Sequence, residues 1–370
     1  MTPRRPRVHV LFTGGTISMR IDRQTGAAFP ALSGRQILAR VRGLGPDVRL
    51  GFEDYDRLPG PHVTPRWMWR LRTRVAELLA DPQIDGVVVT HGTDTVEETA
   101  YLLHLTLESR RPVVFCGAMR TISEPGWDGP ANLAAAIRTA AHPDSRERGT
   151  LVTIGDGIHS AAEVTKRHTH SLSAFASPLG PLGVVDRSEV VYGRPPAREP
   201  VIPARRLEPR VDLHVMAAGV DGGLIRASLE RGARGLVVEA TGVGNVPPAA
   251  LPGLRAAIAR RVPVVVVSRC PEGRVSPAYG YQGGGETLRQ MGVLFGGDLP
   301  GPKARIRLMV ALGAAGGRDG VATYFPSEWS GVTPPATPSS RSRRARNRAK
   351  RTRSVRPGPR PTPPPPRRSS

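Results

Sequence analysis

Two threonine-containing turns hold the side chains of this sequence that could act as nucleophiles. Thr16 lies in the turn 13–17 (Thr-Gly-Gly-Thr-Ile), and Thr93 lies in the turn 90–95 (Thr-His-Gly-Thr-Asp-Thr). A threonine hydroxyl is a weak nucleophile at neutral pH, so it needs a base within hydrogen-bond reach. Each turn alone also fits an ordinary loop, because glycine permits tight reversals of the chain.

Two charged residues could serve the second turn. Asp94 follows Thr93 directly, and Lys166 lies in the polar segment 162–171. A lysine in such a segment is more often a solvated surface residue than a site residue. Asp94 and Glu97 also have the spacing of a helix N-cap pair, which is a purely structural interpretation.

Both turns directly follow short apolar runs. Residues 8–12 and 86–90 are typical of buried strands, and a helical pattern follows the second turn. An open α/β sheet places ligands at this position, where a strand ends and the next helix begins.

Strand-like runs alternate with amphipathic helices through most of the chain, which predicts a mostly parallel sheet covered on both faces. Further strands are expected at 48–52, 112–116, 151–154, 211–216, 235–239 and 262–268, and helices at 36–41, 64–80, 131–141, 222–231, 254–261 and 303–312. Residues 18–33 suggest a mobile loop over a site or a surface connection. Residues 175–185 contain Pro and Gly and are expected to be irregular.

The fold class expected is α/β with two α/β domains. A larger N-terminal domain at 1–194 has a mostly parallel sheet flanked by helices, a proline-rich linker follows at 195–210, and a smaller C-terminal α/β domain covers 211–330. Residues 331–370 are expected to form a disordered basic tail rich in Pro, Ser and Arg.

The net charge of +22 is unevenly distributed, because the segment 331–370 carries twelve Lys or Arg and no acidic residue. Such a tail favours non-specific contact with polyanions, but it has no aromatic residue to stack on bases. Two cysteines and scattered histidines predict neither a disulfide framework nor a metal cluster. The N-terminus lacks the apolar core of a signal peptide, and no apolar run reaches membrane-spanning length, so a cytoplasmic protein without membrane contact is expected.

Taken together and in order, seven motifs resemble the bacterial-type L-asparaginase family. They are the turns 13–17 and 90–101, Gly117-Ala118-Met119-Arg120, Asp128-Gly129-Pro130-Ala131-Asn132-Leu133, Val164-Thr165-Lys166, Gly242-Val243-Gly244-Asn245 and Lys303-Ala304-Arg305. The resemblance covers roughly residues 8–315, and its first two motifs are highly specific as a pair.

The resemblance implies hydrolysis of the side-chain amide of a small substrate, no cofactor, and homotetramers built from dimers with sites between subunits. Matching motif by motif gives Thr16 as the primary nucleophile, with Thr93, Asp94 and Lys166 as the second catalytic group. Lys166 could accept a proton from Thr93, Asp94 would orient it and bind a substrate ammonium, and backbone N–H groups could hold the oxyanion. Substrate contacts are expected from Gly15, Gly92, Thr93, Asp94, Gly60, Pro61 and Ala118.

Three positions depart from the family pattern. The family usually has a tyrosine on the loop after its first threonine, and an ungapped alignment places Phe29 there. The pair that grips the substrate's α-carboxylate falls at Gly60 and Pro61, which offer no side-chain donors. Pro247 replaces a polar residue that some members carry.

These departures leave three functional hypotheses. The chain is expected to be an amidohydrolase that converts L-asparagine to L-aspartate and ammonia. The alternatives are a hydrolase of a different small amide and a non-catalytic small-ligand-binding relative with a polyanion-binding tail.

Overall fold

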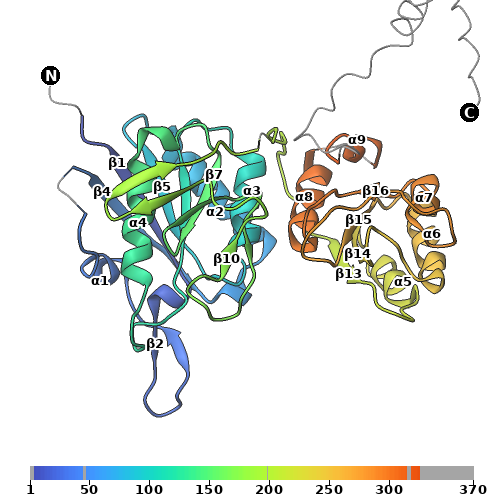
Figure 1. Cartoon of the computed structure of the whole chain (residues 1–370), viewed down its shortest axis with the longest axis horizontal. Coiled ribbons are helices and arrows are strands. Elements are labelled where there is room, and N and C mark those ends of the chain that lie inside the picture. The colour runs from blue at the N-terminus through green and yellow to red at the C-terminus, as the bar shows by residue number, and fades with distance from the viewer. Residues whose placement is uncertain (1–3, 45–46, 198, 315–317, 326–370) are drawn as a thin grey trace, which may run out of the picture. The chain divides into compact units, whose positions relative to one another are not determined.

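The protein is described from a computed structural model that defines residues 4–44, 47–197, 199–314 and 318–325 (Figure 1). The predicted basic tail at 331–370 lies outside these residues. In the part of the chain that the structure describes, no helix is long and apolar enough to cross a membrane.

An eight-stranded sheet forms the centre of the N-terminal domain, in the order β12-β11-β8-β7-β6-β5-β1-β4. The five strands β4, β1, β5, β6 and β7 run parallel. The remaining strands β8, β11 and β12 are joined to the sheet and to one another by antiparallel pairing. The bounds are β1 Arg7–Gly14, β4 Arg49–Leu58, β5 Gly86–Thr90, β6 Val113–Cys116, β7 Thr150–Ile154, β8 Gly157–Ser160, β11 Gly183–Asp186 and β12 Glu189–Tyr192.

Helices cover both faces of this sheet, as the continuous apolar runs of its parallel strands require. Alternate residues of β5 show the two faces: Val87 and Val89 join the core beneath α2 (Pro65–Ala80) and α3 (Val96–Thr106). Val88 joins a separate core beneath α1 (Gly34–Leu38) and α4 (Gly129–Ala141). The prediction of a mostly parallel sheet flanked by helices is therefore confirmed.

Helix starts show where local sequence patterns hold and where they fail. Thr64 caps α2 by accepting the backbone N–H of Trp67, and Pro65 takes the first helical position. The predicted N-cap pair of Asp94 and Glu97 is wrong, because α3 has Thr95 at its N-cap and no side-chain cap bond. Asp94 and Glu97 are thus available for other partners.

The C-terminal domain is built on a smaller, fully parallel sheet in the order β13-β14-β15-β16. One face packs against α5, α6 and α7, and residues of the other face share a core with α8. The bounds are β13 Val211–Val215, β14 Gly235–Ala240, β15 Val264–Ser268, β16 Leu294–Phe295, α5 Gly223–Glu230, α6 Leu251–Ala259, α7 Gly285–Gln290, α8 Gly301–Ala314 and α9 Arg318–Ala322.

Two segments without clear periodicity form short paired strands. Residues 175–185 were expected to be irregular, but β10 (Phe175–Ala176) pairs with β9 (Thr165–Lys166), and β11 begins at Gly183. Within 18–33, β2 (Met19–Ile21) pairs with β3 (Ala28–Pro30) as a hairpin that extends beyond the sheet of this domain (Figure 1).

The proline-rich segment 195–210 packs against α3 in its described part. Ile202 is buried and donates its N–H to Leu105 O at 2.7 Å, and the carboxylate of Glu199 accepts the Tyr101 hydroxyl at 3.0 Å. The prolines of this segment therefore do not prevent its described part from lying on the core.

Candidate active site

The sheet topology creates a crevice at the ends of β1 and β5. The chain leaves β1 toward its neighbour β4, whereas it leaves β5 toward β6 on the opposite side. Such a reversal of strand order is where open α/β sheets bind ligands. Thr16 directly follows β1 in the short helix η1 (Thr16–Ser18), and Thr93 follows β5, so both sequence-predicted hydroxyls lie at this edge.

Backbone contacts between glycines bring three turns together at this crevice. A Cβ on Gly15 would lie 2.6 Å from Gly92 Cα, and a Cβ on Gly92 would lie 2.6 Å from Gly60 Cα. Gly15 donates its N–H to Leu58 O at 2.9 Å, and Thr95 Oγ1 donates to Gly60 O at 2.9 Å. These approaches leave no room for side chains at Gly15 or Gly92.

Lys166 makes the contacts that give the site its chemistry. Its Nζ donates to Thr93 Oγ1 at 2.8 Å and to Asp94 Oδ1 at 2.7 Å. The Lys166 side chain is 15% exposed and Thr93 is buried, whereas the Asp94 side chain is 58% exposed. The ammonium thus lies inside the protein against a hydroxyl, and the carboxylate faces outward, where a cationic group could reach it.

His91 is a structural residue beside this triad. Its Nδ1 lies 2.8 Å from Gly92 O, and its Nε2 lies 3.0 Å from Thr99 Oγ1. Because a carbonyl oxygen only accepts, Nδ1 carries the proton. Burial lowers the pKa of His91 to about 4, so the neutral ring holds the turn in place and is not free to take up a proton near neutral pH.

A fourth turn completes the wall behind Thr93. Gly117 packs so closely that a Cβ there would lie 3.1 Å from Thr93 Cγ2, and Ala118 is fully buried. The Asp128 carboxylate accepts the backbone N–H groups of Met119 and Arg120. The motif around Asp128 therefore fixes the backbone of the turn that adjoins Thr93.

The structure brings most of the predicted site residues together and places two of them at its margin. Thr93, Asp94 and Lys166 form one hydrogen-bonded group, and the turn of Thr16 faces them through the Gly15–Gly92 contact. Gly60 joins this contact, while Pro61 is exposed and Ala118 lies in the wall. The catalytic and binding roles of these residues stay predictions.

Phe29 lies on the β2–β3 hairpin at the position where the resemblance predicts a tyrosine. It pairs with Arg20 across the hairpin, and its side chain is 44% exposed. A phenyl ring can neither donate nor relay a proton. Any activation of Thr16 must therefore come from another group.

Two buried charged residues near the site were not anticipated from the sequence. Glu97 Oε2 accepts the backbone N–H of Lys166 at 3.0 Å, and Lys303 of α8 is fully buried. Lys303 lies in a family motif and Glu97 in a predicted helix-cap pair, but neither pattern predicts that a charged side chain is buried.

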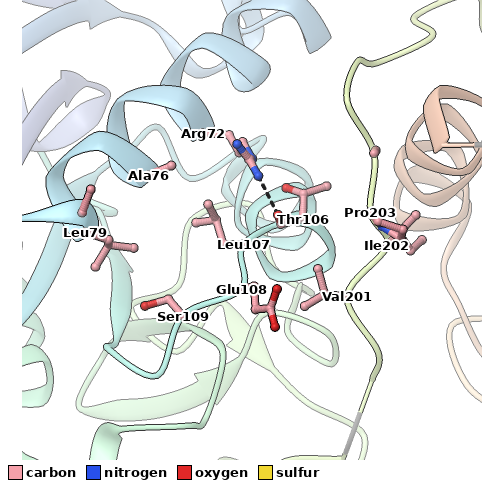
Figure 2. A pocket seen from close by; sticks show the side chains of 12 residues that line it. Arg72, Ala76, Leu79, Thr106, Leu107, Glu108, Ser109, Val201, Ile202 and Pro203 are labelled. Atoms are coloured by element: carbon pink, nitrogen blue, oxygen red, sulfur yellow. Dashed lines mark hydrogen bonds between the residues drawn. The ribbon is translucent and has the colours of Figure 1, made fainter.

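An open cavity of about 720 Å³ lies where the segment 201–204 passes the N-terminal domain (Figure 2). It is lined by the ends of α2 and α3 and by the segment 201–204, with Glu108 and Arg72 among its polar residues. Thr93 precedes α3, whereas this cavity adjoins the end of the same helix. An eleven-residue helix is roughly 16 Å long, so the cavity is separate from the Lys166 group.

Comparison with protein families matches almost all of the described chain. Residues 7–198 match the model of the N-terminal asparaginase domain, and residues 210–325 match that of the glutaminase/asparaginase C-terminal domain. The chain belongs to the asparaginase family. The family models thus include both turns and the Lys166 segment within the first domain.

Individual relatives extend this asparaginase-family match over nearly their whole lengths. A probable L-asparaginase of Deinococcus radiodurans is 40% identical over 86% of this chain and 97% of its own, and an L-asparaginase of Bacillus licheniformis is 35% identical over 86% and 98%. The crystal structure of a probable cytoplasmic L-asparaginase from Campylobacter jejuni superposes with a TM-score of 0.78 at 30% identity, covering 86% of this chain and 99% of that one.

Proposed function

We propose that this protein hydrolyses the side-chain amide of L-asparagine to give L-aspartate and ammonia. The observation that carries the proposal is the Lys166 ammonium group, hydrogen-bonded to Thr93 Oγ1 and Asp94 Oδ1 on a turn that packs against the turn of Thr16. Relatives named L-asparaginase, at 35–40% identity over most of the chain, support the substrate.

In the proposed reaction, Thr16 Oγ1 attacks the amide carbon and loses its proton. That proton goes to the amide nitrogen, the C–N bond breaks, and ammonia leaves a Thr16 ester. Water then attacks the ester carbon and releases the acid together with the free hydroxyl. Thr93 and Lys166 would relay these protons, a role that requires them to lie within hydrogen-bond reach of each other.

Substrate would be held by groups at the outer side of the same turn. The exposed Asp94 carboxylate would pair with the substrate ammonium, and the backbone around Gly15 and Gly92 would contact the amide. Gly60 and Pro61 would contact the α-carboxylate of the substrate through backbone groups and van der Waals contact, because neither has a side-chain donor. Backbone N–H groups near an oxyanion typically contribute about 3 kcal/mol each.

The test is release of ammonia by purified protein from asparagine, glutamine and a panel of small amides. Thr16→Ala, Thr93→Ala and Lys166→Met should each lower kcat at least about 100-fold. Thr73→Ala is the matched control, because Thr73 is exposed on α2 and bonds only to Trp69 O. Wild-type turnover in the Thr93 or Lys166 variant would refute the assigned roles.

A different small amide is the second candidate substrate. The reasons are that Gly60 offers no side-chain donor for an α-carboxylate and that Phe29 occupies the position where a tyrosine is expected. Ammonia release from another amide at a kcat/KM at least about tenfold above that for asparagine would favour it. Thermal stabilisation by asparagine without any ammonia release would instead identify a binding protein.

Assembly, location and tail function complete the proposal. We expect a homodimer or homotetramer in the cytoplasm, acting without a cofactor, and light scattering of the purified protein tests the assembly.

The basic segment 331–370 would contact polyanions non-specifically. Deleting it should abolish salt-sensitive binding to heparin or RNA and leave turnover intact, and equal binding by the truncated protein would refute a role for the tail.

A further inference from the structure

A charged residue of the C-terminal domain lies buried close to the chain segment that carries Lys166. Lys303 of α8 is 0% exposed, and its Nζ donates to Ala162 O at 3.0 Å. Its Nζ also lies 5.6 Å from the centre of the Tyr101 ring. Burying an ammonium group costs free energy unless hydrogen bonds and opposite charges compensate it.

Acidic groups from several elements surround this lysine. Burial lowers the pKa of Lys303 to about 8, whereas Glu97, Glu163 and Asp298 favour its charged form. Burial lowers the pKa of His104 on α3 and of His159 on β8, and the charge of Lys303 lowers both further.

Glu97 links the buried lysine to the active-site segment. Its carboxylate is buried, accepts the N–H of Lys166 at 3.0 Å, and is also hydrogen-bonded by the Thr165 side chain. Burial raises the pKa of Glu97, and the charge of Lys303 opposes that rise. The ionised carboxylate is the form that accepts these hydrogen bonds best.

Together the two residues hold both ends of one short segment. Lys303 binds the backbone at Ala162, and Glu97 binds it at Lys166, four residues later. Because Lys166 must reach both Thr93 and Asp94, a small displacement of this segment would move its Nζ out of hydrogen-bond range. Misplacement by about 1 Å can lower a rate about 100-fold.

We propose that Glu97 and Lys303 are positioning residues: two buried, oppositely charged side chains from the two domains that each bond to the backbone of residues 162–166 and thereby aim Lys166 at Thr93. This inference rests on the proposed function. It adds that the C-terminal domain supplies a charge on which the geometry of the N-terminal site depends.

The test compares Glu97→Gln, Lys303→Met and the double variant Glu97→Gln/Lys303→Met. Lys303→Met should lower kcat at least about tenfold with KM within about threefold, because the substrate-binding groups are untouched. The acid side of its kcat–pH profile should move to higher pH, since Glu97 loses the charge that keeps it ionised. In the double variant no carboxylate is left at position 97 to titrate, so the shift of the acid side to higher pH should disappear. The kcat of the double variant should exceed that of Lys303→Met.

Glu98→Gln is the matched control. Glu98 is the next residue on α3 and is also largely buried, but it faces Arg305 and does not bond to the 162–166 segment. Its kcat should equal that of the wild type. Because the charges of Glu97 and Glu98 repel each other, the acid side of its profile should not move to higher pH. If Lys303→Met does not fold, the nearly isosteric Glu97→Gln decides: it should lower kcat at least about threefold at constant KM.

Hydrogen exchange separates this inference from the proposed function. Backbone amides of residues 162–168 should exchange about tenfold faster in Glu97→Gln and Lys303→Met than in the wild type or in Glu98→Gln. Faster exchange in a protein that hydrolyses no amide would refute the proposed function and keep the positioning role. Unchanged exchange together with wild-type kcat in folded Glu97→Gln would overturn the inference.

Discussion

Replacing Gly92 by alanine should push the turns of the crevice apart. The added Cβ would lie 2.6 Å from Gly60 Cα and 2.8 Å from Gly60 N, whereas ordinary contact begins near 3.4 Å. The turn containing Gly60 must therefore move by nearly 1 Å. Overpacking of this kind costs about 1–3 kcal/mol, and displacement of groups around a reacting centre by about 1 Å costs about 100-fold in rate.

Gly60→Ala provides the matched comparison, because it adds the same methyl group on the other side of the same contact. Its Cβ would meet Asp94 Cβ at 3.4 Å, which is an ordinary separation, and Gly60 has no positive φ. Alanine at such a position usually stabilises a protein by about 0.4–1 kcal/mol by restricting the unfolded chain. The two substitutions should therefore change stability in opposite directions.

Urea unfolding gives the stabilities, and ammonia release gives kcat and KM. We expect Gly92→Ala to unfold at lower urea concentration than the wild type and to lose about 100-fold in kcat. Gly60→Ala should unfold at an equal or higher concentration. A Gly92→Ala variant as stable and as active as Gly60→Ala would refute the claim that these turns are held in register by backbone contact.

Two further substitutions test buried polar groups. Burial raises the pKa of Glu98 from 4.5 to about 7. At about 1.4 kcal/mol per pKa unit, stability should therefore be highest below pH 4.5 and fall by about 3–4 kcal/mol in all once the pH is above 7. Glu98→Gln should remove this fall, which thermal unfolding at pH 5 and pH 8 would reveal, and an unchanged fall would exclude Glu98 as its source. Asn132→Leu should lower the free energy of unfolding, measured with urea, by about 2–4 kcal/mol. The reason is that Gly117 O and the N–H of Gly155 each lose the Asn132 side-chain partner that lies 3.0 Å away. A loss under about 1 kcal/mol would contradict these bonds.

The parts of this molecule that depend on local sequence were predictable. The apolar run ending at Thr90 gave a strand, and Thr64 with Pro65 gave the start of α2, because strand burial and helix capping are encoded within a few residues. The convergence of Thr16 and Thr93 at one edge followed from their positions after strands of a mostly parallel sheet.

Features that depend on distant partners were not predictable in the same way. Asp94 and Glu97 have the spacing of a helix cap, yet their hydrogen bonds go to Lys166, about 70 positions later in the chain. The strand β10 contains only two residues, and it forms because β9 lies beside it. No local pattern distinguishes Lys303 from a solvated helix lysine, because its burial depends on acids contributed by other elements.

The core beneath α3 also contains apolar residues of α8 and of strands β13, β14 and β15, so one apolar interior extends across the domain boundary. Neither domain can therefore be regarded as an independent module. Separating them would expose an apolar helix face on each fragment. Any recombination or engineered fusion at 199–210 that replaced one domain would have to provide a new apolar surface to cover that face.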